Sequence, residues 1–329
     1  MKSQKRLWSV VSVIAVASGC VFAQGGKQTA PRGSQNSVAP FLGRWDLTLQ
    51  TPQGKSPSWL DLSQSHGVLK AEMVGRWGNA RPIPKVEISN GVLSFVSPKA
   101  EENSKTDLVF KGKLIGEMLS GTTTGTGGAP WSWTGKRAPT LATTAPPRWG
   151  TPIALFNGKN LDGWREYSAD GTPATHHWMV INGSLVSPGN GSELVNDKLF
   201  DNFKLHVEWN CGPTSNSGVY LRGRYEVQIE NESMGEPPSH HTGGVYGFLR
   251  PSPELPRSSG KWHAFDITLV GRKVTVVQDG KTLIDNKEIP GITGGALNSN
   301  EGEPGPIMLQ GSEKGHVSFR NIVITPAVN

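Results

Sequence analysis

Three short segments in the second half of the chain combine carboxylate, amide and phenol groups with alternating apolar residues. His206 and Glu208 alternate with large apolar residues in FKLHVEW, as do Tyr220 in GVYLR and Glu226 and Gln228 in YEVQIE. Because successive side chains of a strand point to opposite faces, each segment has one apolar and one polar face. Carboxylates and amides make directional hydrogen bonds, and aromatic rings stack on sugar rings. The pattern predicts a carbohydrate-type site on one sheet face.

Arg222 continues the polar set of the second segment. A merely solvated sheet face would also alternate, and this is the plain alternative. Such faces are usually rich in Lys, Thr and Ser, whereas this one is rich in groups that fix the orientation of a ligand. We therefore favour a binding or catalytic face.

The elements that must position these groups are β-strands. The chain has 329 residues with 41 Gly and 24 Pro, and its apolar runs are short and regularly spaced. Such a composition favours turns and short strands over long helices. Asp279-Gly280 between two alternating runs predicts a tight hairpin. An all-β fold is expected throughout.

Residues 40–137 are expected to form a small β-domain of their own. About eight period-2 segments joined by tight turns predict an antiparallel meander, which can close into a small barrel. Gly43-Arg44-Trp45 resembles the Gly-x-Trp start of lipocalin-type barrels, which bind apolar ligands. The other interpretation is that Trp45 plugs a packed core, and an accessory role is favoured.

The ends and joints of the chain predict export and two domains. Residues 1–23 have the basic, apolar and small-residue parts of a signal peptide, so a periplasmic or secreted location is expected. Cleavage after Ala23 is favoured over a lipoprotein box that would place a lipid anchor on Cys20. Residues 24–39 are a predicted disordered tether and residues 138–150 a linker, which leaves 151–329 as the second domain.

Several classes of function are disfavoured. The formal charge is +6, but the basic residues are scattered among acids, so nucleic acid is not an expected partner. No apolar run is long enough for a transmembrane helix. Cys211 is expected to be a buried structural thiol. No cofactor is predicted. His240 and His241 are adjacent and point apart, so a divalent metal stays only an open alternative.

A series of ordered motifs then carries a family resemblance. ALFNGKNLDGWR, NSGVYLRGRYEVQIE, TGGVYGF, GKW, QDGKTLID and GPIMLQG followed by VSFRNI resemble, in this order, the 3-keto-disaccharide hydrolase domain family. The resemblance covers about residues 151–325. It implies a concanavalin A-like jelly roll and activity on glycosides whose C3 hydroxyl has been oxidised to a ketone.

The resemblance also implies roles for the polar face. A C3 ketone acidifies the hydrogen on C2, so a base can remove it and the C1 substituent can leave. Glu226 and Glu208 are the candidate base and acid, and His206 is a candidate for either role or for a purely structural one. Strand parity and the motif positions also indicate a set of candidate substrate-binding residues: Asn216, Tyr220, Arg222, Gln228, Tyr246, Trp262 and Gln310.

The chain departs from the family at two motifs, one of which, Gly260-Lys261-Trp262 in place of the usual Gly-Glu-Trp, is interpreted as a surface change. Members commonly have Leu-Gln-Asp-His where this chain has Leu309-Gln310-Gly311-Ser312-Glu313, so a His at that position is lost or replaced by His316. Three functions follow in order of preference. The first is an enzyme that cleaves 3-keto-glycosides, the second a non-catalytic carbohydrate-binding module, and the third a structural protein of the cell envelope.

Overall fold

The computed structural model describes residues 37–142, 145–168, 177–231, 235–256, 258–312 and 314–328. The predicted signal peptide with its two cleavage alternatives, Cys20 and most of the predicted tether lie outside these residues. Residues 35–329 form one compact unit. In the described part of the chain, no helix is long and apolar enough to cross a membrane.

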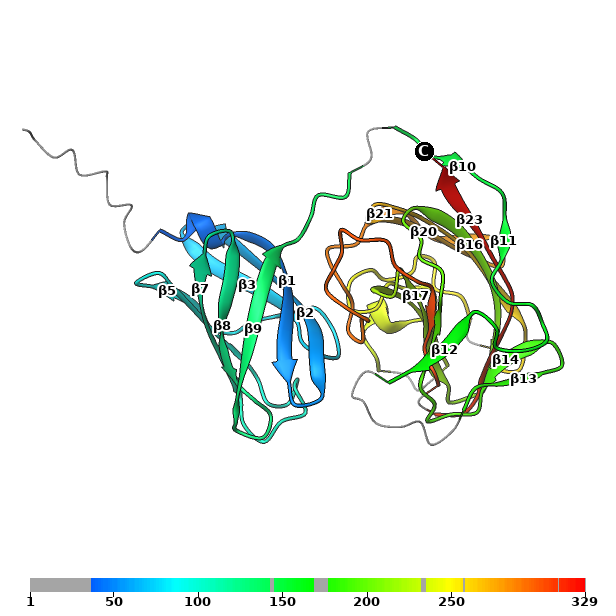
Figure 1. Ribbon diagram of the computed structural model, residues 1–329, viewed down its shortest axis with the longest axis horizontal. Helices are drawn as coiled ribbons and strands as arrows, with labels where there is room; N and C mark the ends of the chain where they lie inside the picture. Colours follow the sequence, from blue (N-terminus) through cyan, green and yellow to red (C-terminus); the bar gives the residue numbers. More distant parts are fainter. Residues whose placement is uncertain are drawn as a thin grey trace, which may run out of the picture. The chain divides into compact units, whose positions relative to one another are not determined.

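The first half of this unit is one rolled antiparallel sheet, which confirms the predicted meander (Figure 1). After a 3₁₀ turn at Ala39–Phe41, the strands are β1 (Gly43–Thr51), β2 (Gly54–Ser65), β3 (Val68–Val74), β4 (Arg81–Pro82), β5 (Val86–Ser89), β6 (Val92–Ser97), β7 (Leu108–Ile115), β8 (Met118–Thr124) and β9 (Pro130–Arg137). Their order in the sheet is β4-β3-β2-β1-β9-β8-β7-β6-β5. Chain neighbours pair except for β4 and β5, which are the two edge strands, and β9 returns to pair with β1.

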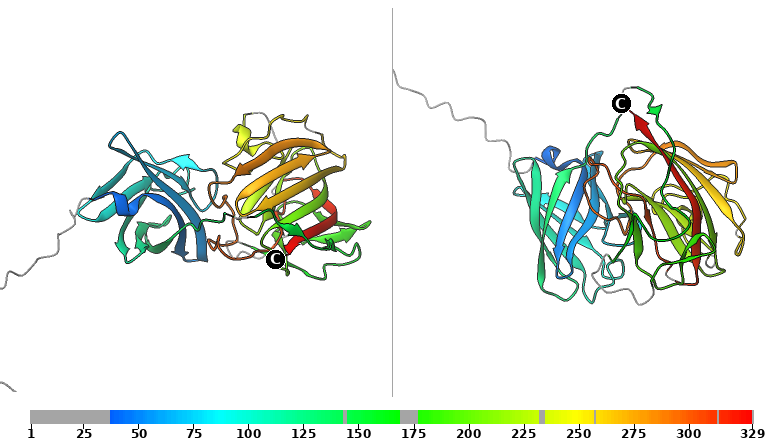
Figure 2. Two further views of the ribbon diagram at one scale, coloured as in Figure 1. Left: turned by 90° about the horizontal axis from the view of Figure 1, so that it is seen from above. Right: turned by 45° about the vertical axis from the view of Figure 1, so that its right-hand side comes forward.

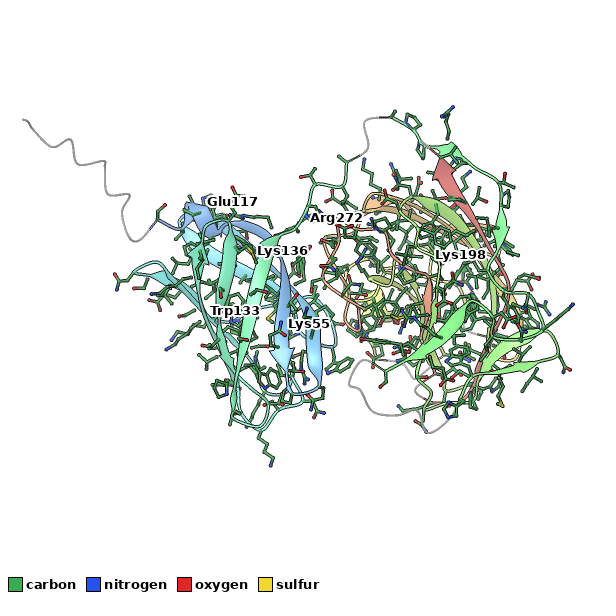
Figure 3. All side chains as sticks on the ribbon, viewed as in Figure 1. Lys55, Glu117, Trp133, Lys136, Lys198 and Arg272 are labelled. Carbon is green, nitrogen blue, oxygen red and sulfur yellow. The ribbon has the colours of Figure 1, made fainter. Side chains whose placement is uncertain are left out.

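Large aromatic side chains fill the inside of the rolled sheet. Trp45 is fully buried, donates from Nε1 to the Phe41 carbonyl at 2.8 Å, and lies under the Arg137 guanidinium at 3.8 Å. Trp133, which is labelled in Figure 3, packs beside Phe95 and Phe110. Burial of these rings stabilises the sheet through the apolar area removed from water. The aromatic packing agrees with Trp45 as a plug of a packed core.

The second half is a two-sheet jelly-roll sandwich, as the all-β prediction and the family resemblance imply (Figure 2). The larger sheet contains β13 (Met179–Ile181), β14 (Ser184–Ser187), β23 (Val317–Val328), β16 (Phe203–Cys211), β19 (His263–Val270), β20 (Lys273–Gln278) and β21 (Lys281–Glu288), and β10 (Arg148–Trp149) and β11 (Ile153–Ala154) also pair with β23. The smaller sheet is β12 (Trp164–Tyr167), β15 (Glu193–Asn196), β22 (Met308–Leu309), β17 (Asn216–Leu221) and β18 (Tyr225–Glu230).

The apolar halves of the alternating strands meet between these two sheets. Phe203, Leu205 and Val207 of β16 pack in one cluster with Val219 of β17 and Val227 of β18. Cys211 belongs to the same cluster, and burial raises the pKa of its thiol to about 11. The predicted hairpin joins β20 to β21, with Asp279 at φ +50° and Gly280 at φ +77°. The smaller sheet therefore turns its other face, with Glu226 and Gln228, away from the core.

A buried pair of carboxyl groups lies between β1 and the loop before β22. Asp46 is 5% exposed and Glu301 fully buried. Burial and the adjacent Glu301 raise the pKa of Asp46 to about 9. The Arg272 guanidinium lies 3.8 Å from Glu301 Oε2. The pair is held together by a proton on Asp46.

Because of this pair, we expect the free energy of unfolding to fall as the pH rises. The unfolded chain releases the Asp46 proton near its ordinary pKa of 3.8, whereas the folded chain keeps it up to about pH 9, so the contribution is lost across that window. We expect Asp46→Asn to flatten the decline of the thermal midpoint and to raise the free energy of unfolding at the alkaline end by about 1–3 kcal/mol. Thermal scans across the window check it. A lower alkaline midpoint for Asp46→Asn would show instead that Asp46 is ionised.

Candidate functional site

The outer face of the smaller sheet gathers the polar side chains of β17 and β18. The two strands pair antiparallel, with Tyr220 opposite Glu226 and Gly218 opposite Gln228. Glu226 is 2% exposed and Gln228 1% exposed. A buried carboxyl group and a buried amide on the face that points away from the sandwich core are costly unless hydrogen-bonded. Their arrangement therefore identifies the centre of the candidate site.

Glu226 and Tyr220 form the closest pair. Tyr220 Oη lies 2.8 Å from Glu226 Oε2 and 2.9 Å from the carbonyl oxygen of Gly294. The hydroxyl has a single proton, which it donates to one of these two oxygens at a time. Burial and the Glu226 charge raise the pKa of Tyr220 well above its usual value, which keeps the phenol protonated. The pair can thus accept and return one proton at the carboxyl group.

Two glycines make room for this pair. A Cβ at Gly218 would lie 2.3 Å from Glu226 Oε1, so only glycine lets the carboxyl group lie flat against β17. Gly295 has φ +73°, and a Cβ there would lie 2.5 Å from Tyr220 Oη. The Gly294-Gly295 turn therefore closes directly over the hydroxyl. Thr293 Oγ1, just before it, accepts from the Glu226 backbone N–H at 3.1 Å.

Amide groups flank the carboxyl group. The Gln228 amide donates to Asn216 Oδ1 at 3.2 Å in one orientation and to Glu226 Oε1 at 3.3 Å in the other. Gln310 follows β22, and its backbone N–H donates to the Gly218 carbonyl at 2.9 Å. Its Oε1 is buried and has no hydrogen-bond partner in the part of the chain that the structure describes. An unmatched acceptor beside a site is suited to a ligand hydroxyl.

Tyr246 extends the site on the other side of β18. Its backbone N–H donates to the Glu226 carbonyl at 3.0 Å, which places the segment after the 3₁₀ turn Pro238–His240 beside β18. The Tyr246 ring stacks on His240 with centroids 4.1 Å apart. Burial lowers the pKa of His240, although Glu236 hydrogen-bonds to Nδ1 at 2.9 Å. His240 therefore serves here as a neutral, stacked ring.

Two residues of this face were missed at the level of sequence. Glu193 on β15 accepts from the Gly311 backbone N–H at 2.9 Å, and its charge contributes to the raised pKa of Tyr220. Tyr167 on β12 lies opposite Glu193 in the sheet. Burial and the Glu193 charge raise the pKa of Tyr167. The sequence SELVN offers no period-2 signal that could have found Glu193, because Leu194 and Val195 are adjacent apolar residues.

His206, Glu208 and Trp262 lie elsewhere. β16 pairs with β19 and β23 of the larger sheet, so its polar side faces away from the site. Glu208 accepts from Arg320 Nε and Asn321 Nδ2, both at 2.6 Å. His206 Nδ1 lies 2.8 Å from Asp266. Trp262 stacks under the Arg320 guanidinium at 3.9 Å. The expectation that one face holds all three strands is corrected, because parity within a strand does not say which sheet the strand joins.

Arg222 is also outside the candidate site. It follows β17 with φ +53° in the tight turn to β18, so the alternation of the strand no longer applies to it. Its side chain is fully buried and donates to Asp201 Oδ1 at 3.1 Å, to Tyr225 Oη at 3.1 Å and to the Gly271 carbonyl at 2.9 Å. These contacts tie the turn to neighbouring loops. The contacts of Arg222 are therefore those of a residue that holds the turn in place.

The part of the departing motif that the structure describes, residues 309–312, lies beside the site, and residue 313 is outside the described residues. Gly311 N–H binds Glu193, and Ser312 is buried with its backbone N–H on Ser187 Oγ at 3.2 Å. His316 is exposed, and its carbonyl accepts from Ser215 Oγ at 2.5 Å. Among the described residues, no three His, Cys, Asp or Glu side chains gather as a metal-binding group.

Comparison with known proteins agrees with the region that the motifs mark. Residues 151–325 match the model of the 3-keto-alpha-glucoside-1,2-lyase-like domain family. A 3-keto-disaccharide hydrolase of Bacteroides thetaiotaomicron is 21% identical over 169 residues, which are 40% of this chain and 57% of that protein. The chain thus spans just over half the length of that relative.

Solved structures give likenesses over part of the chain. Two crystal structures of glycosyl hydrolase candidates from Parabacteroides distasonis are 26% and 20% identical, each with a TM-score of 0.43. They cover 56% and 54% of this chain and 93% and 94% of their own.

Proposed function

Because the chain belongs to the family of 3-keto-alpha-glucoside-1,2-lyase-like domains, we propose that it is an exported enzyme that cleaves 3-keto-glycosides or 3-keto-disaccharides. The reaction is C2 deprotonation and loss of the C1 substituent, followed by addition of water. The buried Glu226–Tyr220 pair on the outer sheet face is the observation that carries the proposal. Export rests on the predicted signal peptide.

The reaction needs a group that accepts and returns a proton, and it does not need a nucleophile on the protein. The C3 ketone lets a base take the proton from C2, and the electron pair moves toward the ketone oxygen as an enolate. Collapse of the enolate breaks the C1–O bond, and the leaving oxygen takes up a proton. Water then adds its oxygen to C1 and returns a proton to C2, so the net result is hydrolysis. General acid–base catalysis of this kind contributes about 10²–10⁴-fold.

Glu226 is the proposed base. Its position away from bulk water strengthens its interaction with a neighbouring proton donor, and Tyr220 fixes the carboxyl orientation. Glu226, once it carries the C2 proton, is the proposed donor to the leaving oxygen, and Glu193, on the neighbouring strand pair, is the second carboxyl group of this face. Gln228 and the unpartnered Gln310 Oε1 are proposed to hold sugar hydroxyls.

The pair is closed off in this structure, since Glu226 and Tyr220 are each 2% exposed. Substrate therefore reaches it only after a covering segment moves. The Gly294-Gly295 turn is the part that touches Tyr220 Oη, and consecutive glycines can change conformation at little steric cost. The proposal accordingly includes an opening of this turn.

Solvent deuterium tests the proposed route. The protein without residues 1–23 is incubated in D₂O with 3-keto-trehalose or an aryl 3-keto-glucoside, with EDTA and with added divalent metals in parallel. We expect release of the C1 substituent and one deuterium at C2 of the product, which mass spectrometry and NMR detect. Cleavage without deuterium at C2 would still support a glycoside-cleaving enzyme but would reject C2 deprotonation. Saturable sugar binding with no release under any condition would favour the binding module.

A further inference from the structure

One loop of the first sheet lies against both segments that flank the Glu226–Tyr220 pair. A Cβ at Gly294 would lie 2.6 Å from the Gly78 carbonyl oxygen, and a Cβ at Gly247 would lie 2.9 Å from Asn79 Cα. Asn79 Oδ1 also contacts His240 Nε2, the ring that stacks on Tyr246. Such backbone contacts require glycine on the sandwich side. The loop of residues 76–80 is therefore part of the cover of the candidate site.

A cavity of about 460 Å³ opens beside this loop, which is within the range of about 300–1,000 Å³ that is typical of small-ligand sites. Gly295, Ala296 and Tyr167 line it from the sandwich, and Arg76 and Trp77 line it from the first sheet. Gly295 is the residue that packs on Tyr220 Oη. Gly295 thus lines the cavity and also lies against the hydroxyl of the proposed catalytic pair.

The lining of the cavity has the character of a sugar subsite. Trp77 is 42% exposed, which is uncommon for so large an apolar ring, and the Arg76 guanidinium lies 5.9 Å from its centroid. Gln53, Lys55 (labelled in Figure 3) and Asn103 add hydrogen-bonding groups around it. Arg76 Nε is buried with no hydrogen-bond partner within the described residues. An open aromatic face beside polar groups and an unmatched donor suits a polyhydroxylated ring.

We infer that this cavity holds the sugar that leaves as the C1 substituent, with Trp77 as its stacking platform. The inference rests on the proposed function for its place next to the reacting ring. It gives residues 40–137, which lie outside the matched family region, a part in choosing the leaving group. The substrate class that follows is a 3-keto-disaccharide rather than a 3-keto-glycoside with a small C1 substituent.

Trp77→Ala tests the inference with two substrates that share the oxidised ring. For 3-keto-trehalose we expect KM to rise about two- to tenfold, because one aromatic stacking contact is lost. For methyl 3-keto-glucoside, whose C1 substituent is too small to reach Trp77, KM should not change. Trp77→Phe should restore most of the affinity. Ile115→Ala, at an exposed position of the same sheet that does not line the cavity, is the matched control.

A titration with glucose separates this inference from the proposed function. Calorimetry on the intact chain should show saturable glucose binding that Trp77→Ala weakens and Ile115→Ala leaves intact. If wild-type protein cleaves neither substrate, the proposed function fails and the glucose titration alone decides the cavity. Equal changes of KM for both substrates, unchanged KM for both, or glucose binding that is insensitive to Trp77→Ala would overturn the inference.

Discussion

Glu226→Gln is expected to abolish nearly all turnover while the protein stays folded. Glutamine has the shape of glutamate and can still contact Tyr220 Oη, but it cannot take a proton from C2. We expect kcat for 3-keto-trehalose to fall by about 10²–10⁴-fold, the usual contribution of a general base. KM should change little, because no hydroxyl-binding group is removed. Steady-state kinetics with a circular dichroism check of folding measure it.

Two variants control for this result. Tyr220→Phe removes the hydroxyl that orients the carboxyl group, so we expect a smaller fall in kcat and an altered pH profile. Glu208→Gln, on the larger sheet, should leave kcat unchanged because Glu208 binds Arg320 and Asn321 away from the site. Full activity of Glu226→Gln would remove Glu226 from the mechanism, and loss of activity in Glu208→Gln would point to the other sheet.

The sequence allowed accurate prediction of which side chains of a strand face the core, but it did not allow prediction of which sheet a strand joins. The alternation in FKLHVEW, GVYLR and YEVQIE correctly separates core residues such as Val207 and Val219 from polar ones. The alternation gives no information on strand pairing: β16 pairs with β19 and β23, whereas β17 pairs with β18 and β22. Pairing in a jelly roll joins strands far apart in the chain, so hydrogen-bond partners are set by tertiary packing. Glu208 and Glu226 were placed on one face for this reason.

Local backbone conformation explains the other difference. Strand parity predicts Arg222 on the polar face because it is two residues after Tyr220, but Arg222 lies in the turn at φ +53°. A positive φ is uncommon for arginine, and no residue in LRGRY other than Gly223 marks a turn. Gly218, on the same strand as Tyr220, is a second residue whose role the alternation does not predict. A glycine inside a strand signals a close approach, here by the Glu226 carboxyl group, which a periodicity argument passes over.

No pattern in the sequence predicts that the loop of residues 76–80 from the first sheet covers the candidate site. RWGNA contains one tryptophan and one glycine between β3 and β4, which reads as an ordinary connection. Its contacts with Gly294, Gly247 and His240 involve residues more than 150 positions away. The domain boundaries at 40–137 and 151–329 remain a prediction, and the contacts of this loop argue that the two parts act together in substrate choice.

Arg222→Ala should separate a structural role from a substrate-binding one. The fully buried guanidinium donates to Asp201, Tyr225 and the Gly271 carbonyl, and its removal leaves buried acceptors without a donor. Asp201 is largely exposed, so the ion pair itself is screened, and most of the loss comes from the other two bonds and from packing. We expect a loss of about 2–4 kcal/mol in the free energy of unfolding.

In thermal scans this loss corresponds to a midpoint lower by about 5–15 °C. Below the new midpoint, KM and kcat of Arg222→Ala should match the wild type, since no atom of Arg222 is placed among the site residues. Arg222→Lys keeps the charge but cannot make the three contacts from one planar group, so its midpoint should lie between the two. A normal midpoint combined with a raised KM would return Arg222 to the substrate site, and would mean that the turn after β17 opens when sugar binds.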